Sequence, residues 1–135
     1  MTTVIAESTG IDRRTGAMLT GWSHVVQSFE TIFTTPYFSR VMRPYVGSAG
    51  LRLFGELANP RTAQRFRFAV ALGFALFEPR FTPTRIDQVD LDRTGATAWI
   101  IEGIYRPRGH LGDTTPAGTR TLNLIATSAG LSVDT

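Results

Sequence analysis

Phe77-Glu78-Pro79-Arg80-Phe81 is the stretch that decides the fold, because an apolar helical pattern ends there and a strand pattern begins. Proline lacks a backbone N–H and pushes the residue before it out of helical geometry, so the helix must end by Glu78. Glu78 and Arg80 therefore place opposite charges at a rigid corner. The sequence predicts either a local ion pair that fixes this joint or a charged face toward a partner.

Upstream of the corner, the residues predict a helix that begins at Asn59-Pro60. Asparagine is a good N-cap, and proline is harmless at the first helical position. Apolar residues lie on both faces of this helix: Phe66, Val70, Gly73, Phe74 and Phe77 on one, and Phe68, Leu72 and Leu76 on the other. An apolar circumference indicates a central, buried helix. Glycine costs about 1 kcal/mol relative to alanine inside a helix, so we expect close packing at Gly73.

Two shorter helices are expected before this one. Apolar residues recur at helical spacing from Ser23 to Phe33, with Ser23 as N-cap, and Thr34-Thr35-Pro36 closes the helix. An irregular, aromatic and basic connection follows from Tyr37 to Tyr45. A second short helix can start at Gly47-Ser48, and its shared apolar face would contain Leu51, Phe54 and Leu57.

Downstream of the corner, the pattern predicts strands. Ile86 to Leu91 and Ala98 to Tyr105 flank the turn Asp92-Arg93-Thr94-Gly95 and form a hairpin. A Gly- and Pro-rich loop from Pro107 to Gly118 precedes a last strand from Thr119 to Ala126. The predicted class is α+β, with N-terminal helices, including the central buried one, packed on a small antiparallel sheet of three strands.

Length and composition favour a single domain. The chain has 135 residues, of which 42% are hydrophobic and 19% charged. We expect an extended or mobile arm over residues 1–15, with structure beginning near Met18, one domain over 16–126, and a tail over 127–135. No leader pattern or membrane span is recognisable, so we expect a soluble protein made in a cytoplasm. Without cysteine, and with only His24 and His110 as imidazoles, neither a metal nor a cofactor is expected.

The basic residues leave one alternative function open. All 14 are arginine, the sequence pI is about 10.2, and the formal net charge is +3. A nucleic-acid-binding surface needs such charges clustered on one face. Here they are spread from Arg13 to Arg120, and the tightest group is Arg61, Arg65 and Arg67. A solvated or protein-facing surface fits this scatter better than nucleic acid does.

A hydrolase is the other alternative. Glu78 could be paired with Glu56 or Asp87 as the two carboxylates of a glycosidase, one protonated and one ionised. Arg80, two residues from Glu78, would favour the ionised form, which is wrong for a general acid. No phosphate-binding glycine loop, nucleophile elbow or metal-ligand spacing is present. We therefore do not expect an enzyme.

The last predicted strand is a candidate for pairing with another chain. A three-stranded sheet leaves two edges with unpaired backbone groups, and an extended partner can add a strand there. The alternating residues of this edge are Thr121, Leu122, Asn123 and Leu124. The alternative is an edge protected by Arg120 and the tail, and the sequence does not decide between the two.

Several ordered blocks between residues 11 and 106 resemble baseplate assembly protein W of contractile-tailed phages. They are Asp12-Arg13-Arg14-Thr15-Gly16, Gly21 to Ser28, Ile32 to Pro36, Ser39-Arg40-Val41-Met42-Arg43-Pro44 with Gly47-Ser48, and the Glu-Pro-Arg signature of Phe77 to Phe81. Phe38 stands where the family commonly has a glycine, and Tyr45-Val46-Gly47 replaces an acidic-aromatic-glycine sequence.

The resemblance implies a structural role in a tail baseplate rather than an enzymatic one. Such proteins are the sheath-initiating wedge component and are related to a type VI secretion baseplate subunit. The implied partners are other wedge proteins, the tail sheath protein and tube or hub proteins, in several copies around a six-fold axis. No small-molecule substrate or membrane is implied, and the location would be the virion tail, after synthesis in the host bacterial cytoplasm. The implied partner-facing residues are Arg40, Arg43, Pro44, Gly47, Glu78, Pro79 and Arg80.

Overall fold

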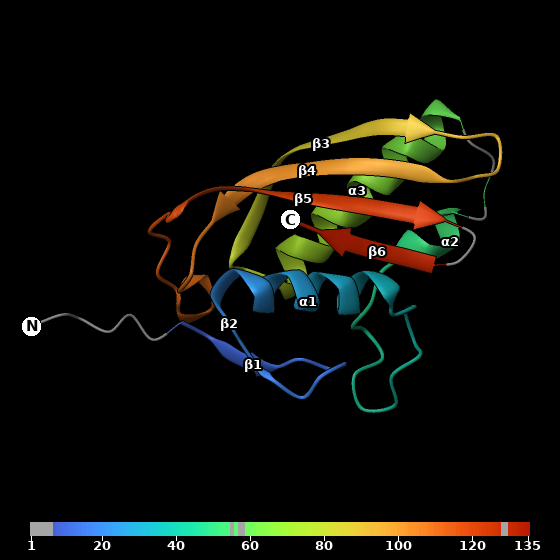
Figure 1. Ribbon diagram of the computed structural model, residues 1–135. Helices are drawn as coiled ribbons and strands as arrows, with labels where there is room; N and C mark the ends of the chain where they lie inside the picture. The colour runs from blue at the N-terminus through green and yellow to red at the C-terminus, as the bar shows by residue number, and fades with distance from the viewer. Residues whose placement is uncertain (1–6, 55, 57–58, 128–129) are drawn as a thin grey trace, which may run out of the picture.

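The computed structural model describes residues 7–54, 56, 59–127 and 130–135. Its elements confirm the α+β class (Figure 1). In chain order they are β1 (Thr9–Ile11), β2 (Met18–Thr20), α1 (Gly21–Thr34), α2 (Gly50–Phe54), α3 (Pro60–Phe77), β3 (Phe81–Leu91), β4 (Thr97–Tyr105), a 3-10 turn (Gly109–Leu111), β5 (Gly118–Thr127) and β6 (Gly130–Asp134). None of the helices in these residues is long and apolar enough to cross a membrane.

The main sheet contains four antiparallel strands in the order β3-β4-β5-β6, so the prediction of three was wrong. The additional strand, β6, lies within residues 127–135, which were expected to be a tail, and it pairs with the end of β5 from Asn123 to Thr127. At the other end, β1 and β2 form a separate hairpin. Ordered structure therefore begins before Met18, within the predicted arm.

The helices cover one face of the sheet, and the hydrophobic core lies between the helices and the sheet. In Figure 1, α3 runs behind β3 and β4, while α1 lies below β6. Every second residue of β4 is buried, as expected for a strand with one face on a core. The rings of Phe29 in α1 and Phe74 in α3 stack at 4.5 Å, which joins the two helices. Buried side chains of the sheet complete this core: Phe81, Trp99, Ile101, Tyr105, Leu122 and Leu124.

Helix α3 begins as predicted but is buried on one face only. Asn59 caps it, because its side-chain oxygen accepts a hydrogen bond from Thr62 N at 2.8 Å. Phe66, Val70 and Phe74 are buried, whereas Phe68 and Leu76 are exposed. A Cβ at Gly73 would meet only Ile32 Cγ2, at an ordinary 3.8 Å. The expected two-sided burial and the tight packing at Gly73 were therefore wrong.

The two shorter helices also differ from expectation in detail. Helix α1 starts at Gly21 after Thr20, so Ser23 lies inside its first turn and is not the N-cap. It ends before Pro36, as predicted. In α2 the buried side chain is Leu53, while Leu51 is exposed. The buried face of α2 is therefore not the predicted one. The third residue of the predicted face, Leu57, lies outside the described residues.

Candidate functional site

The Glu-Pro-Arg corner contains a buried ion pair between Glu78 and Arg80. Helix α3 ends at Phe77, and Glu78 is its C-cap. Arg80 binds the Glu78 carboxylate through two parallel contacts, Nε to Oε1 at 2.5 Å and Nη2 to Oε2 at 2.7 Å. Glu78 is only 2% exposed and Arg80 6%. A planar fork matched to a carboxylate gives a strong, directional pair, and here it fixes the joint between helix and sheet.

Three other segments of the chain close around this pair. Arg80 Nη1 contacts Ser8 Oγ, just before β1. The same nitrogen lies 3.0 Å from His24 Nδ1 in α1. The backbone oxygen of Arg80 accepts a hydrogen bond from Arg106 N at 2.7 Å. A side chain at Gly109 would collide with the backbone oxygen of Pro79. Both charges are thus satisfied within the chain, and a partner-facing role for Glu78, Pro79 and Arg80 stays a prediction.

The structure also places the carboxylates of the hydrolase alternative. Each of the three is bound by an arginine: Glu78 by Arg80, Glu56 by Arg65 at 2.6 Å, and Asp87 by Arg85. Glycoside hydrolysis needs two carboxyl groups that flank one substrate bond, whereas each of these three carboxylates contacts an arginine of this chain. His110 is exposed, as expected. Among the described residues, no three potential metal ligands gather at one point.

Residues 36–46, within the connection between α1 and α2, form a loop that we call the apolar loop. Phe38 N donates a hydrogen bond to Pro44 O at 2.8 Å, and Ser48 N donates to Thr35 O at 2.9 Å. Phe38 has a φ of 65°, a left-handed backbone conformation that favours glycine. At Gly47, with φ 154°, a Cβ would lie 2.6 Å from Thr35 O. This position therefore requires glycine.

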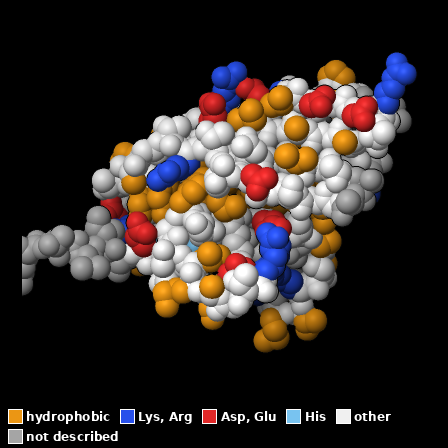
Figure 2. Space-filling view, viewed as in Figure 1, with side chains coloured by type: hydrophobic (Ala, Val, Ile, Leu, Met, Phe, Trp, Pro, Cys, Tyr) orange, Lys and Arg blue, Asp and Glu red, His pale blue; other side chains and the backbone are white. Residues whose placement is uncertain are grey.

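The tip of the apolar loop exposes large hydrophobic side chains. Val41 is 95% exposed, Met42 90% and Phe38 83%. Figure 2 shows hydrophobic side chains projecting from the lower edge of the molecule, where Figure 1 draws this loop. Arg40 and Arg43 flank Val41 and Met42, and the sequence has no acidic residue between Glu30 and Glu56. Exposed apolar side chains gathered in one patch together with arginines are common at protein contacts.

The two edges of the sheet differ in accessibility. Along β3, Pro83 offers no N–H, two register irregularities interrupt the ladder, and Arg67 Nε donates to Ile86 O at 3.0 Å. Such features protect an edge. At the opposite side, β6 pairs with β5 only from Asn123 onward. The preceding part of β5, Gly118 to Leu122, has a described neighbour only in β4.

The predicted strand-addition residues are therefore divided between two environments. Asn123 and Leu124 are paired with Asp134 and Val133 of β6, so they are not at an open edge. Thr121 and Leu122 lie in the half of β5 that β6 does not cover. We call residues 118–122 the open step. The sequence pattern indicated the strand but could not place its end, because it did not reveal β6.

Among the described residues, shifted pKa values are found at three exposed aspartates in turns and at one buried tyrosine. The pKa of Asp12 lies below its usual 3.8 because its carboxylate accepts two hydrogen bonds. Arg14 N donates one at 2.8 Å, and the Thr15 hydroxyl donates the other at 2.9 Å. Turn contacts lower the pKa values of Asp92 and Asp113 in the same way. Burial raises the pKa of Tyr105 above 10.0. These shifts report local turns and burial rather than a proton-transfer site.

Comparison with known proteins identifies similar structures. No family model matches the sequence, and no curated protein matches it. A chain from the cryo-EM structure of the postcontracted pyocin R2 baseplate aligns with a TM-score of 0.65 and 31% sequence identity, over 73% of this chain and 99% of the pyocin chain. The crystal structure of a candidate tail lysozyme from Geobacter sulfurreducens aligns with a TM-score of 0.52 and 22% identity, over 81% of this chain and 92% of that protein. At that identity the second likeness concerns the fold alone.

Proposed function

This chain belongs to the family of contractile-tail baseplate proteins, and on that ground we propose that it links the baseplate wedge to the tail and templates the first sheath ring by strand addition. Its role in the baseplate is structural. The observation that supports templating is the open step of β5, which offers backbone groups beside an already ordered strand. An extended arm of a sheath subunit would pair there, with affinity from the ladder and register from alternating side chains.

The open step suits an added strand better than β3 does. Thr127 and Gly130 close a tight hairpin, so alternate β5 residues, including Thr121, direct their backbone groups to the β6 side. An incoming strand would continue the line of β6 past Asp134. The β3 edge, with Pro83 and the Arg67 contact, is blocked at several positions. This choice refines the predicted edge, which had included Asn123 and Leu124.

The apolar loop is the proposed attachment to a neighbouring wedge protein. Val41 and Met42 would enter an apolar depression of that protein, and Arg40 and Arg43 would pair with carboxylates on its rim. Pro44 and Gly47 hold the loop in its shape. Repetition around a six-fold axis would let contacts of modest affinity act together, and tube or hub proteins would lie alongside.

The proposal is tested most directly by a cryo-EM map of the intact particle. We expect density for this chain between the wedge and the first sheath ring, with a sheath strand along residues 118–122. A map in which the first sheath ring contacts another protein, or in which this chain is absent, would contradict the templating role.

A matched pair of variants tests the same point in solution. Thr121→Pro removes one backbone donor from the open step, whereas Thr84→Pro lies at the irregularity of β3, where no β4 residue is paired with it. We expect Thr121→Pro to prevent sheath assembly on the baseplate while its melting temperature stays close to that of the parent chain. Thr84→Pro should assemble normally. The reverse result would move strand addition to β3.

A further inference from the structure

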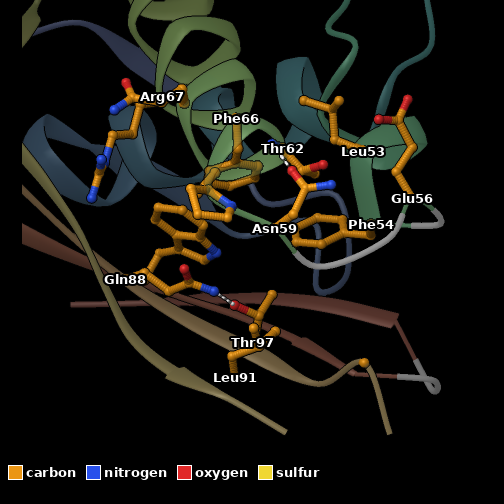
Figure 3. A pocket seen from close by; sticks show the side chains of 15 residues that line it. Leu53, Phe54, Glu56, Asn59, Thr62, Phe66, Arg67, Gln88, Leu91 and Thr97 are labelled. Carbon is orange, nitrogen blue, oxygen red and sulfur yellow. Dashed lines mark hydrogen bonds between the residues drawn. The ribbon is translucent and has the colours of Figure 1, made fainter. Parts of the chain in front are cut away.

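A cavity lies at the end of the molecule where α2 and the start of α3 face the β3–β4 hairpin. It encloses about 440 Å³, within the range of about 300–1,000 Å³ usual for ligand sites. Figure 3 shows Leu53, Phe54 and Phe66 above it and Leu91, Gln88 and Thr97 below. Neither the apolar loop nor the open step contributes to its lining. It is thus a separate feature of the same chain.

The base of the cavity contains a polar group without a partner. Trp99 lines the cavity, is only 3% exposed, and stacks against Phe66 with ring centroids 4.3 Å apart. Its indole Nε1–H has no hydrogen-bond acceptor among the described residues. Buried indole N–H groups usually find an acceptor. An acceptor brought by an occupant would complete the hydrogen bonding of this N–H group.

The other polar groups show which charge that occupant should carry. Gln88 Nε2 donates to Thr97 Oγ1, which donates to Asp90 O, so this chain of contacts is complete. The Glu56 carboxylate is bound by Arg65. Arg67 lies over the Trp99 ring, with Cζ 5.9 Å from its centroid, and its described hydrogen bond uses Nε alone. The donors still available at the cavity therefore favour an anionic oxygen.

We propose that this cavity binds an extended segment of a partner protein that inserts one aromatic or branched apolar side chain and sets an adjacent carboxylate against Arg67 and Trp99. The apolar walls fit the side chain, and the two donors fit the carboxylate. The expectation that the occupant is a protein rests on the baseplate role proposed above. The donor chemistry does not depend on it.

NMR provides a direct test, because the chain has only two tryptophans and hence two indole N–H signals. The probe is a synthetic peptide, Gly-Ser-Phe-Asp-Ser-Gly, with blocked ends. We expect it to move the Trp99 indole signal downfield and to leave the Trp22 signal in place. Trp99→Phe identifies the signal. The matched probes replace aspartate by asparagine or phenylalanine by alanine, and each should bind about tenfold more weakly.

Variants of the protein complete the test. Arg67→Met keeps an unbranched stem over Trp99 but removes the charge, and it should weaken the Phe-Asp peptide about tenfold without changing the weak binding of the Phe-Asn peptide. Arg61→Met, at an exposed position outside the cavity lining, is the control and should have no effect. Equal binding of both peptides, or an unmoved Trp99 signal at millimolar peptide, would overturn the proposal.

A further titration with a small molecule tests whether the cavity binds a protein segment or a small carboxylate. If 3-phenylpropionate moves the Trp99 signal and the peptide does not, the cavity is a small-carboxylate site and the partner assignment is wrong. Loss of sheath templating in Thr121→Pro is independent of these measurements. The cavity proposal and the proposed function can therefore fail separately.

Discussion

The Glu-Pro-Arg corner and the apolar loop carry similar residue types but use them in opposite ways. At the corner, Arg80 and Glu78 are buried and bind each other. In the apolar loop, Arg40 and Arg43 accompany side chains that are almost fully exposed, and no acidic residue lies nearby in the sequence. The buried pair is satisfied within the fold, whereas we propose that the arginines beside the exposed apolar surface bind a partner.

The largest effect should come from breaking the corner. Arg80→Met leaves the Glu78 carboxylate buried without its partner, and removal of one member of a buried pair costs about 3–5 kcal/mol. We expect the free energy of unfolding, measured by urea denaturation at neutral pH, to fall by that amount. The control is the double variant Glu78→Gln/Arg80→Met, which buries no charge. It should be more stable than Arg80→Met alone, and equal losses in both would mean that the pair is not the main contribution.

The second effect should concern binding and leave stability unchanged. Val41→Asp/Met42→Asp places two negative charges on the apolar tip, and loss of a central contact costs about 2 kcal/mol or more, roughly thirtyfold in affinity. We expect little of this variant in purified particles, as measured by immunoblot, and an unchanged melting temperature.

Leu76→Asp supplies the matched control for the loop variant, because Leu76 is also an exposed apolar residue but lies on the outer face of α3. It should be incorporated normally. If Leu76→Asp were excluded and the loop variant retained, the attachment surface would be α3 instead. Phe68, exposed on the same helix, would then be the next residue to change.

A third, smaller effect concerns the core beside the corner. Gly73→Ala meets only an ordinary contact with Ile32, and alanine favours a helix over glycine by up to about 1 kcal/mol. We expect a gain of about that size in the free energy of unfolding. Destabilisation would mean that the helices are packed more closely at Gly73 than the distances indicate. Gly47→Ala is the contrasting change, because Thr35 O blocks a Cβ there, and it should lower stability.

The sequence predicted those features that are determined by residues close together in the chain. The change of period at Pro79, the Asn59 cap and the turn from Asp92 to Gly95 are determined by neighbouring residues, and all three were confirmed. Strand β6 was missed because five residues with two apolar positions, Leu131 and Val133, are too short to give a clear period.

Long-range contacts gave no such signal. Ser8 reaches Arg80 across 72 residues, so no spacing in the sequence could have joined them at the corner. The burial of α3 was overestimated for a related reason: an apolar helix face can be covered by its own chain or by a partner, and periodicity does not separate the two. For the same reason, the exposure of the apolar loop became evident only in the fold.

The smallest effect should be a pH dependence of the β1–β2 turn. Asp12 has a lowered pKa in the folded chain, so its contribution is present above its ordinary value of 3.8 and is lost as the pH falls through the folded value. The Arg14 amide, which donates to this carboxylate, should shift in NMR spectra over about pH 5 to 2. In Asp12→Asn the same amide should lose that titration. Because the turn is exposed and far from the buried pair at the corner, Arg80→Met should leave the apparent pKa of Asp12 unchanged; a coupled shift would show that the hairpin and the corner, joined through Ser8, behave as one unit.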